Sequence, residues 1–150
     1  MSGARPAPLR DGDFPVLVPI TTRWADNDAF SHINNVAYYS FFDTAVNMWL
    51  VENGILDIAS SPLVGLVVET GCRYRRPLAY PMTVRIGLRV ARLGTSSVRY
   101  DVAAFDTAEE AAAEGNFTHV YVDRASGRPA SIPEDWREKF RRIAVPATPS

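Results

Sequence analysis

Cysteine, histidine and lysine are scarce in this chain. Its 150 residues include one cysteine (Cys72), two histidines (His32 and His119) and one lysine (Lys139), so 15 of the 16 basic residues are arginine. A single cysteine excludes a disulfide within the chain and fits a reducing compartment. Two histidines and one cysteine lack the ligand spacing of a zinc site, so we expect no bound metal.

Other common signals are also missing. No apolar run reaches the ~18 residues that a membrane-spanning helix needs, and residues 1–15 have no apolar segment of the secretory type. We therefore expect a cytoplasmic protein. The formal net charge of −1 gives no overall attraction to nucleic acid or membranes. No glycine-rich phosphate loop and no Gly-x-Ser-x-Gly turn are present, which argues against nucleotide cofactors and elbow-type serine hydrolases.

One long helix is predicted after the polar segment 24–35. Asn34 or Asn35 can cap its start, and Gly54 can end it. Apolar residues between them recur at steps of three and four: Val36, Tyr39, Phe42, Val46 and Trp49. A helix of about 18 residues is ~27 Å long. Because its other side is also largely apolar, we expect other elements to wrap around it.

The remaining pattern predicts a sheet. Residues 16–24 suit a strand in which Pro19 indicates an edge position or a later start, and four more strands are expected at 64–74, 82–90, 98–104 and 112–123. Three consecutive hairpin-like connections would make the sheet antiparallel. Residues 134–142 form a short helix opened by Pro133. We predict a disordered arm at residues 1–12 and a single two-layer α+β domain at residues 13–145.

The candidate chemistry lies just ahead of the long helix, where Asp26, Asp28 and His32 precede Asn34 and Asn35. The first N–H groups of a helix lack partners within it and attract negative charge. A carboxylate beside them can attack an acyl carbon or activate a water while those N–H groups hold an oxyanion. The alternative reading makes both aspartates loop residues that accept backbone N–H groups.

These residues resemble a known family. The pattern Asp26-x-Asp28-x-x-x-His32-x-Asn34-Asn35-x-x-Tyr38, followed by Phe41-Phe42-Asp43-x-Ala45, is similar to the hotdog-fold acyl-CoA thioesterases of the 4-hydroxybenzoyl-CoA thioesterase type. The likeness spans about residues 16–142 and includes the segments 73–78, 94–98 and 118–129. It implies hydrolysis of an acyl-CoA thioester, with an antiparallel sheet wrapped around the long helix.

The resemblance also assigns roles. It makes Asp28 the catalytic carboxylate, as nucleophile or general base, and gives the backbone N–H of Asn35 the oxyanion. His32 becomes a further catalytic candidate, whereas Asp26 is structural. The implied substrate-binding residues are Tyr38, Arg75, Arg76, Arg92 and Thr95. The family uses no cofactor beyond the CoA of its substrate, and it assembles as homodimers or homotetramers by joining sheets edge to edge, with the site at the subunit interface.

One departure and several alternatives remain. Many relatives have glycine immediately before the histidine, where this chain has Ser31, and serine adopts positive φ less readily, which predicts a slightly different loop path. The substrate could be a thioester of acyl carrier protein, a strongly acidic partner that would need an arginine patch near the pocket. A hotdog hydratase fits the Asn34-Asn35 helix start less well. A protein that binds acyl-CoA without turnover is the alternative outside catalysis.

Overall fold

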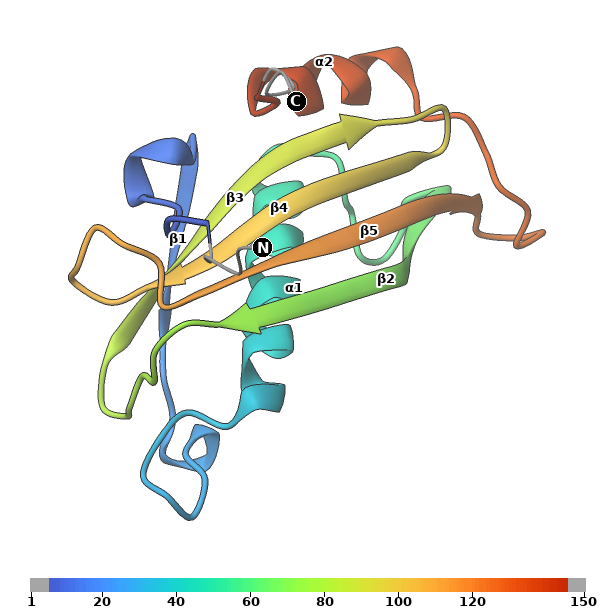
Figure 1. Ribbon diagram of the computed structural model, residues 1–150. Helices are drawn as coiled ribbons and strands as arrows, with labels where there is room; N and C mark the ends of the chain where they lie inside the picture. The colour runs from blue at the N-terminus through green and yellow to red at the C-terminus, as the bar shows by residue number, and fades with distance from the viewer. Residues whose placement is uncertain (1–5, 146–150) are drawn as a thin grey trace, which may run out of the picture.

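One antiparallel sheet curves around the long helix α1 (Figure 1). The computed structural model describes residues 6–145. In chain order the helices and strands of this part are β1 (Val16–Thr21), α1 (Asn35–Glu52), β2 (Leu63–Tyr74), β3 (Thr83–Leu93), β4 (Ser97–Phe105), β5 (Ala113–Asp123) and α2 (Glu134–Arg142). The order and the α+β class agree with the sequence prediction, and β1 is shorter than expected because the chain turns into a 3-10 helix at Trp24–Asp26.

The strand order is β1-β3-β4-β5-β2, and every neighbouring pair is antiparallel. β1 is an edge strand, as Pro19 predicts. The prediction of three consecutive hairpins was wrong at the first one. β2 does not pair with β3 but crosses to the far edge and pairs with β5, from Leu63 opposite Asp123 to Tyr74 opposite Ala113.

The main core lies between the concave face of the sheet and α1. Phe42, Ala45 and Val46 of α1 are fully buried against inward-facing residues of the strands such as Leu88 and Val102. The opposite side of α1 is not covered by any residue from 6 to 145, since Val36 is 72% and Met48 40% exposed. The expected wrapping is therefore complete on one side of the helix only.

A second apolar cluster lies on the outer face of the sheet. Phe14 packs edge-on against Phe105 of β4, with Ala103, Ala111 and Leu9 beside them. Gly87 of β3 makes room for it, because a Cβ there would lie 2.7 Å from Cγ of Phe14. Residues 1–5 of the predicted disordered arm lie outside the described residues. At the inner end of that arm, the Asp11 N–H donates to the Glu109 carbonyl and the Leu9 N–H donates to the Glu114 carboxylate, so the prediction of a disordered arm does not hold for residues 9–11.

The C-terminal helix α2 packs against α1 and completes the fold. Phe140 of α2 is fully buried and lies with its ring centroid 5.6 Å from that of Trp49 in α1. None of the helices within residues 6–145 is both long enough and apolar enough to cross a membrane.

Candidate active site

The first residue of α1 offers an unused N–H group. Asn34 caps the helix: its side-chain oxygen accepts the Val36 N–H at 2.9 Å, and its carbonyl accepts the Ala37 N–H at 2.9 Å. The Asn35 N–H, one residue ahead of these two donors, donates to no acceptor among residues 6–145. It is therefore available to an oxyanion, as the resemblance implies.

A tight loop holds Asp28 beside this helix start. Asp28 Oδ1 accepts the Phe30 N–H at 2.8 Å and the His32 N–H at 3.3 Å, while the Asp28 N–H donates to the His32 carbonyl at 2.8 Å. Asp28 Oδ2 accepts no hydrogen bond from any described residue. One carboxylate oxygen thus fixes the loop, and the other is left for chemistry.

Ser31 makes the turn of this loop with φ of 65°. This is the left-handed conformation that glycine adopts freely and that costs other residues about 1–2 kcal/mol. The absence of glycine therefore does not require a different loop path, because Ser31 itself adopts the left-handed conformation.

Asp26 has a structural environment. It is only 3% exposed, and its carboxylate accepts the Arg23 backbone N–H at 2.7 Å and an Arg23 guanidinium N–H at 2.8 Å. Burial by itself would raise the pKa of Asp26, but the hydrogen bonds from Arg23 outweigh it and hold that pKa below the usual value. The Asp26 carbonyl also accepts the Asn34 N–H at 2.7 Å, which positions the helix cap.

Asp28, His32 and Asn35 line one pocket of about 270 Å³. The other residues of its wall are Ile33, Tyr38, Tyr74, Arg75, Arg76 and Pro77. Tyr38 is 2% exposed, and burial raises its pKa to about 12, so its phenol stays neutral. The Tyr74 hydroxyl donates to the Asn35 carbonyl at 2.8 Å. Sequence reasoning did not select Tyr74, because a single bond from a strand end to a helix start leaves no pattern in the sequence.

The two arginines of the pocket wall are already paired. Arg75 binds Glu114. Arg76 forms a bidentate ion pair with Asp106, in which its two terminal guanidinium nitrogens donate to the two carboxylate oxygens at 2.7 and 2.9 Å. This hydrogen bonding lowers the pKa of Asp106 to about 2. Both side chains stand where the resemblance places substrate contacts, but their charge is balanced within the chain.

The other two predicted substrate contacts lie far from this pocket in the same chain. Arg92 is at the end of β3, and Thr95 is in the following turn, where its carbonyl accepts the Ile132 N–H at 3.0 Å. That end of the sheet is the one beside α2, and the loop between β1 and α1, to which Asp28 belongs, lies at the opposite end of the molecule (Figure 1). Arg89, another arginine of β3, pairs with Asp101 at 3.0 Å and covers the Phe14 ring on the outer face.

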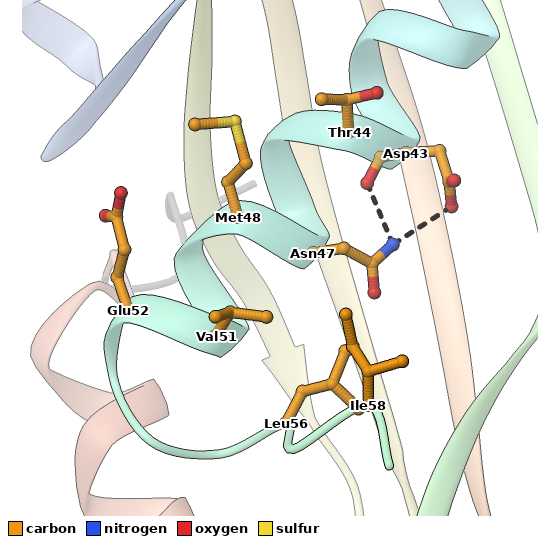
Figure 2. A pocket seen from close by; sticks show the side chains of 8 residues that line it. All are labelled: Asp43, Thr44, Asn47, Met48, Val51, Glu52, Leu56 and Ile58. Atoms are coloured by element: carbon orange, nitrogen blue, oxygen red, sulfur yellow. Dashed lines mark hydrogen bonds between the residues drawn. The ribbon is translucent and has the colours of Figure 1, made fainter.

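A larger hollow of about 600 Å³ follows the exposed side of α1 and has a different character. Figure 2 shows Met48, Val51, Leu56 and Ile58 forming an apolar floor, and at its upper end the Asn47 side-chain amide donates to the backbone carbonyl and to Oδ1 of Asp43. It contains no helix start and no carboxylate beside a free N–H. We call it the α1 groove.

The chemistry available at the helix start is acyl transfer. Asp28, with one carboxylate oxygen free of hydrogen bonds, and Asn35, with a free backbone N–H, border one small pocket, which suits attack on a carbonyl carbon and stabilisation of the resulting oxyanion. Cys72 offers no nucleophile, because burial raises the pKa of its thiol to about 11. Within residues 6–145 no group of three or more histidine, cysteine, aspartate or glutamate side chains could hold a metal ion.

Comparison with known proteins gives a consistent result. The family model of the thioesterase-like superfamily matches residues 22–140. None of the curated proteins matches the chain. Among solved structures, the PA5185 protein from Pseudomonas aeruginosa is 49% identical, with a TM-score of 0.90 over 95% of this chain and 100% of that chain.

Two further structures carry informative names. A thioesterase from Thermus thermophilus, solved with coenzyme A and Zn, is 30% identical, with a TM-score of 0.73 over 87% of this chain and 95% of that chain. A 1,4-dihydroxy-2-naphthoyl-CoA thioesterase from Synechocystis is 13% identical, with a TM-score of 0.76 over 87% of this chain and 98% of that chain, and supports the fold alone. The hotdog fold expected from the resemblance is confirmed.

Proposed function

The chain belongs to the thioesterase-like superfamily, and we propose that it hydrolyses an acyl-CoA thioester to the free acid and CoA. The observation that carries the proposal is the shared pocket of Asp28 and the Asn35 N–H at the start of α1. The relative from Thermus thermophilus that was solved with coenzyme A supports the choice of CoA as the carrier of the acyl group.

In the proposed reaction the thioester oxygen faces the start of α1. As the carbonyl carbon becomes tetrahedral, the Asn35 N–H holds the developing oxyanion, and one such donor is typically worth about 3 kcal/mol. Asp28 Oδ2 either takes a proton from the attacking water or attacks the carbon itself to give an anhydride that water then cleaves. In both routes the C–S bond breaks, and CoA leaves as a thiolate that takes up a proton.

His32 contributes mainly through its backbone in this proposal. Its N–H and carbonyl both bond to Asp28, so it fixes the carboxylate whose free oxygen reacts. The His32 side chain is exposed at the pocket wall and can contact the substrate near the thioester.

We also propose that two copies join through β2. This edge strand has 12 residues and exposes Leu66, Val67 and Val68 in a row at 50%, 47% and 58%. A long edge strand with exposed apolar side chains can pair with a strand of a second molecule. The other edge, β1, has six residues and is interrupted by Pro19, which suits it less. Such a dimer would also bring a second copy close to the exposed side of α1.

The test is thiol release from acetyl-, medium-chain, long-chain and aromatic acyl-CoAs by the parent and by Asp28→Asn. We expect the parent to hydrolyse part of this panel and the variant to lose about a hundredfold or more in kcat. Asp135→Asn, which changes an exposed carboxylate on α2, is the matched control and should retain the parent rate. Equal rates for parent and Asp28→Asn would contradict the assignment, and binding of acyl-CoA with no thiol released would favour a non-catalytic protein.

A further inference from the structure

A small, largely enclosed cavity, separate from the catalytic pocket, lies between α1 and the β2–β5 edge of the sheet. Its volume is about 80 Å³, and its wall is formed by Asn47, Leu50, Ile55, Leu56, Leu63, Val64, Gly65, His119 and Tyr121. Nothing in the catalytic proposal uses it. By volume it holds two or three water-sized groups, at about 30 Å³ each.

Two buried polar groups of this wall lack partners. His119 is 2% and Tyr121 3% exposed, yet His119 Nδ1 and the Tyr121 hydroxyl form no hydrogen bond with any residue that the structure describes. Leaving such a group unsatisfied costs about 1–3 kcal/mol. Both residues line the cavity, so a polar guest there can supply the missing bonds.

The backbone of β2 is shaped around the imidazole. A Cβ at Gly65 would lie 3.0 Å from His119 Cγ and 3.1 Å from His119 Nδ1. A side chain at position 65 would require the imidazole to shift by a few tenths of an ångström. The glycine therefore keeps room for a histidine at a position where the rest of the core uses apolar side chains.

The cavity accepts an uncharged guest. Burial lowers the pKa of His119 to about 4, so the imidazole is neutral at pH 7 and has one donor and one acceptor nitrogen. None of the side chains that line it among the described residues is cationic, which leaves no counter-charge for a carboxylate. A hydroxyl group both donates and accepts, and so it matches a neutral imidazole beside a phenol.

The catalytic pocket and this cavity both border β2, at Tyr74 near one end of the strand and at residues 63–65 near the other. Asn47 and Leu56 belong to the walls of both the cavity and the α1 groove, and Asn47 lies twelve residues after Asn35 on α1. The separation of twelve residues corresponds to about 18 Å along the helix. The apolar side chains of the groove offer an alkyl chain a surface where it reaches the cavity.

We propose that the cavity is a distal acyl subsite that binds the terminal hydroxyl of a long acyl chain. The inference rests on the proposed thioesterase function and specifies its substrate class. A chain ending in a methyl group would leave His119 Nδ1 and the Tyr121 hydroxyl without partners, whereas a terminal hydroxyl satisfies them.

The test compares matched pairs of long-chain acyl-CoAs, such as dodecanoyl-, tetradecanoyl- and hexadecanoyl-CoA and their ω-hydroxy counterparts. We expect kcat/KM of the parent to be about tenfold or more higher for the hydroxylated member of at least one pair. Tyr121→Phe, which keeps the ring, and His119→Phe, which replaces the imidazole by an apolar ring, should bring this ratio close to one. Tyr100→Phe is the matched control, because it removes an equally buried and unpartnered hydroxyl that does not line the cavity, and it should keep the parent ratio.

The same pairs are titrated into Asp28→Asn by calorimetry to separate binding from hydrolysis. A ratio near one in the parent for every pair, or a ratio that survives in Tyr121→Phe, would overturn the subsite while leaving the proposed hydrolysis intact. A preference for the ω-hydroxy member in binding, without hydrolysis by the parent, would support the subsite and contradict the proposed function. Absence of both binding and hydrolysis would overturn both proposals.

Discussion

The hydroxyl of Tyr74 donates a 2.8 Å hydrogen bond to the carbonyl oxygen of Asn35, the first residue of α1. This bond ties the end of an edge strand to the helix start whose N–H groups face the pocket. The Tyr38 ring packs edge-on against the Tyr74 ring, with 5.1 Å between the ring centroids. The position of the proposed oxyanion donor thus depends on the sheet as well as on the helix cap.

Tyr74→Phe should remove this bond and keep the ring contact. A hydrogen bond of this kind contributes about 1 kcal/mol, so we expect kcat/KM for a hydrolysed acyl-CoA to fall roughly fivefold. The fall should appear in kcat more than in KM, since the helix start acts on the oxyanion. Steady-state kinetics beside Tyr100→Phe checks this, and identical kcat values for Tyr74→Phe and parent would contradict the role given to the bond.

The pair of Arg76 and Asp106 should make stability depend on pH in the acid range. The pKa of Asp106 is about 2 in the folded chain, below the ordinary aspartate value of 3.8, so the unfolded chain binds the proton first as pH falls. The stabilisation is present above about pH 4 and is lost between about pH 4 and pH 2. Asp106→Asn should therefore lower Tm at neutral pH, and its difference from the parent should shrink across that interval. A difference that stays constant from neutral pH to pH 2 would show that the pair does not carry the effect.

The outer apolar cluster should stabilise the fold without touching the chemistry. Phe14 is 6% exposed and lies under the Arg89 guanidinium, 5.0 Å from its ring centroid. Phe14→Ala should cost about 3 kcal/mol in the free energy of unfolding, measured by urea denaturation. Phe30→Ala, at a site that is 80% exposed, is the control and should change that free energy by less than about 0.5 kcal/mol. A decrease in the free energy of unfolding for Phe14→Ala no larger than that for Phe30→Ala would contradict the packing described for the outer apolar cluster.

Self-association should depend on the edge of β2. Val68 is 58% exposed and lies at a break in the β2–β5 register, so a lysine there is compatible with the fold and unfavourable for a second strand. Sedimentation should give a dimer or tetramer for the parent and a species near the chain mass of 16.6 kDa for Val68→Lys. Leu17→Lys on the other edge strand is the control and should keep the parent mass. A monomeric parent, or a Val68→Lys protein with the parent mass, would contradict assembly through β2.

Local signals made α1 and its ends readable from the sequence. Asn34 as a cap, the apolar repeat and Gly54 after Asn53 predict a helix of about 18 residues, and the helix runs from Asn35 to Glu52. Gly54 has φ of 69°, the left-handed conformation expected at a helix end. These features act within a few residues of the chain, so no knowledge of distant contacts is needed.

Strand order was harder because it depends on distant partners. The segment between β2 and β3 has the length and prolines of a turn, yet β2 pairs with β5. Part of the reason is the close approach of two glycines, since a Cβ at Gly115 would lie 2.2 Å from the Gly71 carbonyl oxygen. Such a contact between residues 44 positions apart leaves no signature in a single sequence.

The site was predictable where its residues are neighbours in the chain. Asp28, His32 and Asn35 come together, as does Tyr38, because they share one loop and one helix start. Arg75 and Arg76 reach the same pocket from the end of β2, but their pairing with Glu114 and Asp106 depends on the fold. Arg92 and Thr95 stay at the other end of the sheet, so any contact that they make with substrate would have to come from a second copy.

The central claim is that the Asn35 N–H holds the oxyanion of the thioester, and substituting Asn35 tests it most directly. Asn35→Ala keeps the N–H, whereas Asn35→Pro removes it at the one helical position where proline is favoured. The extended conformation of Asn34, with φ of −61° and ψ of 138°, is compatible with a following proline. We predict that kcat for acyl-CoA hydrolysis stays within about threefold of the parent in Asn35→Ala and falls about a hundredfold or more in Asn35→Pro, with both proteins folded by circular dichroism. A folded Asn35→Pro protein that hydrolyses at the rate of Asn35→Ala would contradict the account.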